Sequence, residues 1–428
     1  MNQGLFRFIE ESPTAFHAVA ATGRRLEEAG FRRLEETERW ELERGASYYT
    51  TRNGSALIAF RIPGGAFSGY LMTAAHGDSP CYKIKENAEY KHDGYVSLST
   101  EGYGDMINAS WTDRPLSVAG RVTVRTGKGM EVRLVDLKEP VALVPNVSIH
   151  MNRDMNKNST YNPARDMQPL LCDEKGMGRS LRERIAGILG IPAENILTTD
   201  LYIYNPQKGI CWGDYISAPR LDDLQCAYAC LSGIISAKPE SAVAVFCLFD
   251  NEEVGSMTKQ GADSTFLSDV LERIASGLGM DGQEQAEKLA NSFMISADNA
   301  HALHPNHGEF RDPNQTVHMN GGIVFKLNAN QKYTTDAVSA ALMRLVCEKA
   351  EVPYQYYANR ADMKGGSTIG NISASRVSVN TVDVGLAQLA MHSAFETAGS
   401  RDTEYLARAV KLYYGRSIVK NGGSYELN

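Results

Sequence analysis

The sequence lacks the features that would place the protein at a membrane or on nucleic acid. No segment of the 428 residues approaches the ~20 consecutive apolar residues that a membrane-spanning helix needs. The first residues, MNQGLFRFIEESPTAF, hold no basic start followed by an apolar core, so we expect no signal peptide. The net charge of -7 argues against a non-specific nucleic-acid partner. We therefore expect neither a membrane nor nucleic acid among the partners.

Cysteine patterning is also missing. The seven cysteines are scattered and form no Cys-x-x-Cys pair. An odd, unpatterned set indicates reduced thiols and predicts a cytoplasmic protein. The composition, with 43% hydrophobic and 22% charged residues, is ordinary for a globular protein.

The length and the local patterns predict one domain inserted into another. At 428 residues the chain is long enough for two domains with a sizeable core. Residues 1–80 and 213–428 alternate buried-type strands with amphipathic helices, which is typical of an α/β domain. Residues 81–212 instead hold alternating or β-branched segments separated by Gly, Asp and Asn turns. We predict an α/β domain interrupted by a mostly β insert.

The most informative segment is an apolar run that ends in acids. Residues 243–249 are dense in β-branched and aromatic side chains and predict a strand buried on both faces. The run stops at the sequence DNEE, residues 250–253. Acids at the tip of a buried strand cost desolvation energy unless a cation compensates them, and ligands bind at that end of open α/β sheets. Taken alone, the same tetrapeptide is more often a polar turn between strand and helix.

Other strand ends and helix starts carry similar groups. A predicted strand at 70–75 ends in His76 and Asp78, where the carboxylate can accept the proton of the far imidazole nitrogen. Asp222 and Asp223 stand where a helix begins, and helix capping is the alternative interpretation for either. We also predict a strand at 377–382. The candidates are His76, Asp222, Glu252, Glu253, Asp298 and His392.

Two histidines and several carboxylates suffice for two first-row metal ions, with zinc, cobalt or manganese favoured by mixed nitrogen and oxygen ligation. Such a pair activates a water and polarises a carbonyl, and one remaining glutamate can take the proton. Lys326 lies inside an apolar strand, where a lysine needs a partner. The glycine-rich turn at 365–370 can hold a carboxylate or an oxyanion through its backbone N–H groups. It is not a P-loop, because no lysine follows the glycines.

Motifs in a fixed order run along almost the whole chain. They are SPTAFHAV (12–19), AAHGDSP (74–80), DRPLSVAGRV (113–122), PNVSIHMNR (145–153), PRLDDL (219–224), DNEEVGS (250–256), SADNAHALHPN (296–306), GGIVFKLNANQKY (321–333), GGSTIG (365–370) and MHSAFE (391–396). Together they resemble the M18 metallopeptidases, the aspartyl aminopeptidase family. The resemblance implies a zinc-peptidase-type α/β/α catalytic domain interrupted by a β-rich dimerisation domain. It also implies that dimers assemble into a tetrahedral dodecamer whose active sites face an internal chamber.

Position by position, the resemblance implies a role for each site residue. It assigns His76, Asp222 and Asp298 to one metal, and Asp222, Glu253 and His392 to the other, with Asp222 bridging. Glu252 takes the general-base position, and Asp78 supports His76. His150 matches either a metal ligand or a substrate contact, and its place in the insert favours substrate. The remaining substrate positions are His301, Lys326, Gly366 and Ser367.

Two departures from the family pattern bear on specificity. The family pattern RLDN reads RLDD here, which adds a negative charge at Asp223, and Lys364 precedes the glycine turn. Both leave the chemistry intact but weaken the case for a strict preference for N-terminal Asp or Glu. The expected function is nonetheless an aminopeptidase with two divalent ions, most simply zinc, acting on peptides with a free N-terminus.

Three alternatives stay open at this point. One is an aminopeptidase of broader specificity. Another is a dinuclear deacylase or carboxypeptidase on the same fold, which would need a basic residue for a C-terminal carboxylate. The third is a scaffold that keeps the fold but has lost its metals. Peptides with blocked and free N-termini separate the first two from each other, and metal analysis decides the third.

Overall fold

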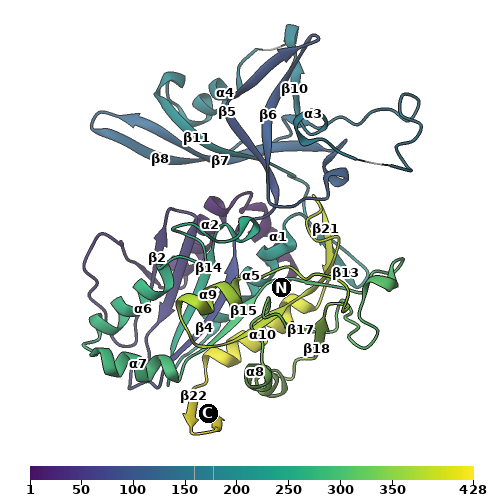
Figure 1. Ribbon diagram of the computed structural model, residues 1–428. Helices are drawn as coiled ribbons and strands as arrows, with labels where there is room; N and C mark the ends of the chain where they lie inside the picture. Colours follow the sequence, from purple (N-terminus) through teal and green to yellow (C-terminus); the bar gives the residue numbers. More distant parts are fainter. Residues whose placement is uncertain (159, 177) are drawn as a thin grey trace.

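The computed structural model describes residues 1–158, 160–176 and 178–428. Its largest element is a nine-stranded mixed sheet at the centre of the lower body in Figure 1. In spatial order the strands are β1 (Arg32–Arg33), β2 (Ser47–Arg52), β3 (Ala56–Arg61), β14 (Val243–Phe249), β4 (Tyr70–His76), β15 (Phe293–Ala297), β19 (Asn380–Gly385), β17 (Ile323–Leu327) and β18 (Tyr354–Ala358).

Helices cover both faces of this sheet. The core on one face includes residues of α1 (Asn2–Glu10), α2 (Ala15–Glu28), α5 (Leu221–Ser236), α8 (Ala337–Lys349) and α10 (Asp402–Tyr414). The core on the other face includes residues of α6 (Phe266–Gly277), α7 (Gly282–Ala290) and α9 (Ile369–Arg376). The predicted α/β/α layering is confirmed.

The three middle strands are parallel and share one register. Phe249 of β14 lies opposite His76 of β4, and Ser296 of β15 lies opposite Ala74 of β4. All residues of β4, β14 and β15 are buried, as their apolar composition predicts for strands covered on both faces. Their carboxyl ends therefore meet at one edge of the sheet, where parallel strands collect ligand-binding residues.

The last helix is attached to these strands by two buried tyrosines. The hydroxyl of Tyr413 donates to the carbonyl of Phe293 at 2.6 Å and accepts from the amide of Met72 at 3.0 Å. The hydroxyl of Tyr414 donates to the carbonyl of Val245 at 2.8 Å. One helix thus fixes all three site-bearing strands.

The insert is a separate antiparallel structure above this body in Figure 1. Six strands close into a ring and the seventh pairs with β7 outside it: β11 (Ile196–Tyr204), β5 (Cys81–His92), β6 (Tyr95–Tyr103), β10 (Leu170–Asp173), β9 (Ala142–Leu143), β7 (Pro115–Thr126) and β8 (Gly129–Asp136). Two helices, α3 (Pro163–Asp166) and α4 (Leu181–Leu189), belong to the same region. Its alternating side chains fill a core of their own, as the period-two pattern predicts.

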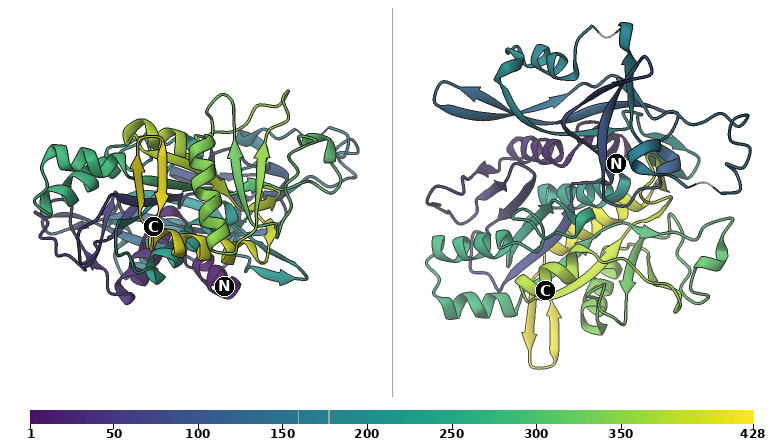
Figure 2. Two further views of the ribbon diagram at one scale, coloured as in Figure 1. Left: turned by 90° about the horizontal axis from the view of Figure 1, so that it is seen from below. Right: turned by 45° about the horizontal axis from the view of Figure 1, so that its top comes forward.

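A smaller sheet and a hairpin complete the structure. The sheet contains β12 (Ile210–Trp212), β13 (Tyr215–Ala218), β21 (Glu396–Gly399), β20 (Ala387–Leu389) and β16 (Ala300–His301). The C-terminal hairpin, β22 (Ile418–Asn421) and β23 (Ser424–Leu427), lies at the end of the body opposite the insert (Figures 1 and 2). Within the described residues, no helix is long and apolar enough to span a bilayer.

One predicted strand is misplaced. The segment expected as a strand at 377–382 starts directly after α9, which ends at Arg376, and only its residues 380–382 lie in β19. Val377 is the C-cap of α9 and is buried in the same hydrophobic core as Ile369, so its apolar character reflects the end of a helix.

Candidate metal centre

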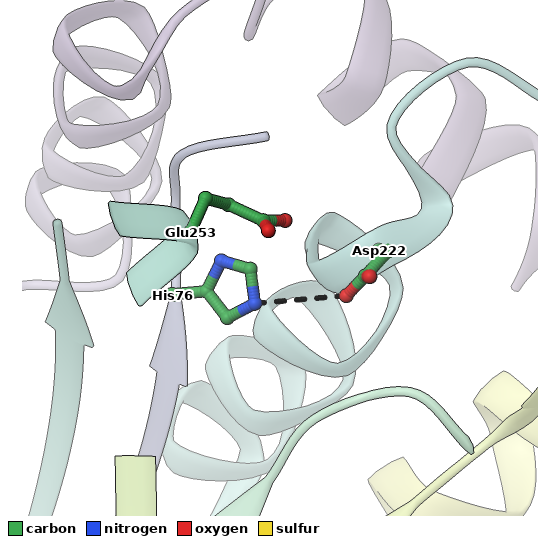
Figure 3. Close-up of side chains that lie close together, drawn as sticks. All are labelled: His76, Asp222 and Glu253. Carbon is green, nitrogen blue, oxygen red and sulfur yellow. Dashed lines mark ion pairs between the residues drawn. The ribbon is translucent and has the colours of Figure 1, made fainter. Parts of the chain in front are cut away.

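The structure gathers the predicted ligand candidates at the carboxyl edge of β4, β14 and β15. His76 ends β4, and Glu252 and Glu253 lie in a short 3-10 turn after β14. Asp298 follows β15, and Asp222 stands at the start of α5. Figure 3 shows His76, Asp222 and Glu253 converging from separate segments of the chain. His392, between β20 and β21, joins them.

Asp222 is the centre of this cluster. Its Oδ1 lies 3.6 Å from His76 Nε2, and its Oδ2 lies 3.3 Å from His392 Nε2. Asp298 Oδ1 is 3.8 Å from His76 Nε2, on the first side. Glu253 Oε2 is 3.3 Å from His392 Nε2, on the second. The two oxygens of one carboxylate therefore face two separate sets of donors.

The donor set fits divalent metal ions. Ligand atoms of His76, Asp222 and Glu253 lie within 4.8 Å of one another, and so do those of His76, Asp223 and Asp298. Asp222 Oδ1, Asp223 Oδ1 and Glu253 Oε1 are buried, and none has a hydrogen-bond partner in the described structure. An unpaired buried carboxylate oxygen is costly, and a cation bound at this cluster would compensate that cost. Imidazole nitrogen with carboxylate oxygen is a ligand set that zinc accepts.

The buried acids and histidines of the cluster have shifted pKa values. Burial raises the pKa of Glu252 to about 8, and it also raises the pKa of Glu253. Burial alone would lower the pKa of His392, but its contact with Asp222 raises it to about 9. For His76 too, burial alone would lower the pKa, but its contacts with carboxylates, first of all Asp222, raise it. Burial alone would raise the pKa of Asp222, but His392 and His76 hold it well below its usual range.

Asp223 has a different role from the one its sequence position suggests. It is fully buried, and its Oδ2 accepts the backbone N–H of His76 at 3.2 Å. Neither Asp222 nor Asp223 caps α5, whose first residue is preceded by Arg220 without a side-chain cap, so the capping alternative is wrong. Burial raises the pKa of Asp223.

Sequence reasoning missed Glu396, the last residue of the MHSAFE motif. One of its oxygens accepts the backbone N–H of His392 at 2.8 Å, and the other accepts that of Asp222 at 3.1 Å. It is 2% exposed, so it ties the two segments together inside the protein. The available signal in the sequence was its position in the motif that also holds His392.

The cluster opens into a pocket of about 210 Å³. Lys326 lies in its wall, 3% exposed, with its Nζ 3.3 Å from Asp298 Oδ2 and 5.6 Å from the ring centre of Tyr333. Burial alone would lower the pKa of Lys326, but the carboxylate of Asp298 raises it, so the side chain stays charged. His301, Gly366 and Ser367 also line this pocket.

His150 is the one candidate that the structure leaves apart. It lies exposed in a turn of the insert and is not among the described residues that line the pocket. Within one chain it therefore has no contact with the metal centre.

Comparison with known proteins decides the family. Residues 8–414 match the family described as "Aminopeptidase I zinc metalloprotease (M18)". The chain belongs to the M18 family. A probable M18 family aminopeptidase 2 from Clostridium acetobutylicum is 44% identical over 96% of this chain and 97% of its own.

Solved structures of M18 relatives share the fold. A chain in the cryo-EM structure of the Ape4 and Nbr1 complex superposes with a TM-score of 0.93 at 32% identity, covering 96% of this chain and 85% of that one. The S. cerevisiae mApe1 dodecamer gives a TM-score of 0.83 at 26% identity, covering 96% and 95%. The M18 chain described here is accordingly a zinc metallo-aminopeptidase, and the cluster at the sheet edge is its candidate zinc centre.

Zinc binding is expected to release protons near neutral pH. The pKa values of Glu252, Glu253, His76 and His392 are all raised, which favours the protonated forms of these side chains. A cation displaces those protons, so the apparent zinc affinity should increase as the pH rises from about 6 to about 9. Calorimetric titration with zinc, in buffers of different ionisation enthalpy, measures the number of protons released. A value of zero near pH 7 would contradict this account, and His392→Gln should release fewer protons than the unmodified protein.

Proposed function

We propose that this M18 enzyme uses two divalent ions, most simply zinc, to remove N-terminal Asp or Glu from peptides. The observation that carries the proposal is that the two carboxylate oxygens of Asp222 face different histidines, His76 at 3.6 Å and His392 at 3.3 Å. His76, Asp222 and Asp298 would hold one ion, and Asp222, Glu253 and His392 the other. When bound, the ions supply Lewis acidity toward water and toward the carbonyl of the scissile peptide bond.

Glu252 is the proposed general base. Its carboxylate has neither an ion pair nor a hydrogen bond to any described residue, whereas Glu253 contacts His392. Its side chain lines the pocket, so it can receive a proton from the attacking water and pass it to the leaving amine. Backbone N–H donation from Glu252 to Asp78 Oδ1 at 3.3 Å holds the turn in place.

Glu252→Gln should keep both metal ions yet lose turnover by about 10²–10⁴-fold or more, because a general base is removed without a ligand. Glu253→Ala should instead lose metal. Elemental analysis and kcat on the same preparations check both statements. If Glu252→Gln lost metal and Glu253→Ala kept it, the two roles would have to be exchanged.

An acidic N-terminal side chain would be recognised at the Lys326 side of the pocket. Lys326 and His301 are the cationic or polar candidates there, and the backbone at Gly366 and Ser367 can donate to a carboxylate. Because Lys326 already pairs with Asp298, it would serve the substrate and a proposed metal ligand together. Broader aminopeptidase specificity is the outcome if this recognition is weak. Cleavage of peptides with a blocked N-terminus would point to a deacylase or carboxypeptidase.

Lys326→Met should weaken cleavage after Asp or Glu much more than cleavage after Ala or Leu, because a charge-assisted hydrogen bond is lost only where an anion binds. Values of kcat/KM on matched peptides that differ only in the first residue measure this split. Metal content must be determined in parallel, since the variant also removes the partner of Asp298. An equal loss on all peptides with metal retained would make Lys326 structural and contradict the acidic preference.

We further propose that two copies form a dimer through the insert and that dimers assemble into a dodecamer. Support comes from the mApe1 dodecamer and from apolar side chains that β8 exposes, including Met130 and Val132 at 59% and 51%. In such an assembly His150 would reach the pocket of the neighbouring chain as a substrate contact. The scattered, unpaired cysteines favour a reducing, cytoplasmic setting.

Mixed dimers test the shared site. His150→Ala and Glu252→Gln should each be nearly inactive alone. Co-expression should restore partial activity, because one site of a mixed dimer then combines intact Glu252 with the intact His150 of the partner chain. Mixed dimers without recovered activity would mean that His150 does not act across the interface. Co-expressed His150→Ala chains carrying two distinguishable tags provide the control for tagging and assembly.

A further inference from the structure

A tyrosine of the insert contacts a residue that supports the candidate metal centre. Tyr103 is the last residue of β6, and its hydroxyl donates to Asp78 Oδ2 at 2.8 Å. Asp78 is 4% exposed and stands next to His76, with Oδ1 3.4 Å from His76 Nδ1. The same Nδ1 lies 3.1 Å from the backbone oxygen of Asp78. A side chain of the insert thus contacts Asp78, and Asp78 in turn contacts the proposed ligand His76.

Asp78 also accepts hydrogen bonds from the turn that carries Glu252 and Glu253. Its Oδ1 accepts the backbone N–H of Glu252 at 3.3 Å, and its Oδ2 accepts that of Glu253 at 3.2 Å. The carboxylate therefore holds both the His76 turn and the turn that carries the two glutamates. The hydroxyl of Tyr103 makes the shortest of these contacts and is the only one that comes from the insert.

The direction of the tyrosine hydrogen bond is fixed by its other neighbour. Asn251 Nδ2 donates to Tyr103 Oη at 2.9 Å. The amide is oriented because Asn251 Oδ1 accepts from Thr258 at 2.8 Å and from Gln260 at 2.7 Å. Since an amide NH₂ only donates, the hydroxyl proton is committed to Asp78. The ring of Tyr103 packs edge-on against Tyr202 of β11 at 5.7 Å.

The backbone next to Tyr103, at Gly104, lies close to the turn that carries Glu253. Gly104 has φ +74°, and a Cβ there would lie 3.1 Å from Glu253 Cβ and 3.3 Å from Glu253 O. A side chain would therefore both strain the backbone and push β6 away from the glutamates. The close approach is what lets the hydroxyl reach Asp78.

We propose that Tyr103 is a positioning residue for the zinc centre. Its hydroxyl fixes Asp78, and Asp78 in turn fixes His76 and the turn of Glu252 and Glu253. The docking of the insert on the catalytic body thereby sets zinc affinity and turnover, in addition to any part the insert has in assembly. The inference rests on the proposed ligand role of His76. Tyr103 does not line the pocket that holds Lys326, where the substrate side chain is proposed to bind, so KM should not depend on it; it lines a second cavity together with Asp222 and His392.

Tyr103→Phe removes only the hydroxyl, and Tyr202→Phe is its matched control. The Tyr202 hydroxyl has no side-chain hydrogen bond to any described residue, and its ring forms the other half of the same aromatic pair. Zinc affinity, measured by competition with a chromogenic chelator, should fall about 10–100-fold in Tyr103→Phe, as for other groups that orient metal ligands. At saturating zinc, kcat should fall while KM stays unchanged. Wild-type affinity and kcat in Tyr103→Phe, or an equal loss in Tyr202→Phe, would overturn the proposal.

A second pair of variants covers the case in which Tyr103→Phe folds poorly. Gly104→Ala should weaken zinc binding because its Cβ collides with the Glu253 turn. Gly94→Ala is the control, because Gly94 also has a positive φ, +87°, in the insert but nothing within 4 Å of its Cβ position. Equal zinc affinity in the two alanine variants would contradict the proposal.

His76→Ala separates this inference from the function on which it rests. Loss of zinc in His76→Ala supports the ligand assignment. If His76→Ala kept its full zinc content, the ligand assignment itself would fail. If it lost zinc while Tyr103→Phe and Gly104→Ala bound zinc like the unmodified protein, only the positioning role of Tyr103 would fail.

Discussion

Buried negative charge at one edge of the central sheet is the constraint on which the rest of the structure depends. Carboxylates from three segments meet two histidines there, and Asp222, Asp223 and Glu253 each keep a buried oxygen without a partner. In a low-dielectric interior such groups must be protonated or paired with a cation. The raised pKa values of Glu252 and Glu253 express the first solution, and membership of a zinc peptidase family points to the second.

The scaffold keeps this unfavourable cluster together by rigid attachment of the strands that carry it. Parallel pairing in register of β14, β4 and β15 puts the three strand ends side by side. Tyr413 and Tyr414 bind the backbone of the same strands from α10, and Glu396 joins the segments of Asp222 and His392. A site that loses a ligand would therefore retain its framework, since these bonds do not pass through the metal.

The insert is part of the same arrangement. Its ring of strands has a separate hydrophobic core, so it does not need the catalytic body in order to bury apolar surface. Its contact at Asp78 is a hydrogen bond from Tyr103, and the backbone of Gly104 lies close to Glu253. Polar contacts of this kind contribute more to orientation than to stability, because much of their energy offsets desolvation.

The sequence by itself determined the layered α/β architecture, the β-rich insert and the set of ligand candidates. Strong apolar runs such as 243–249 specify buried strands locally, and acids or histidines at their ends then fall at one sheet edge by topology. Tertiary structure decided what depends on contacts between distant segments. The burial of Asp223, the bridge made by Glu396 and the reach of Tyr103 join residues that lie far apart in the sequence. Val377 was misjudged for the same reason, because an apolar residue at the end of a helix and one at the start of a strand have the same local pattern until the core around them is known.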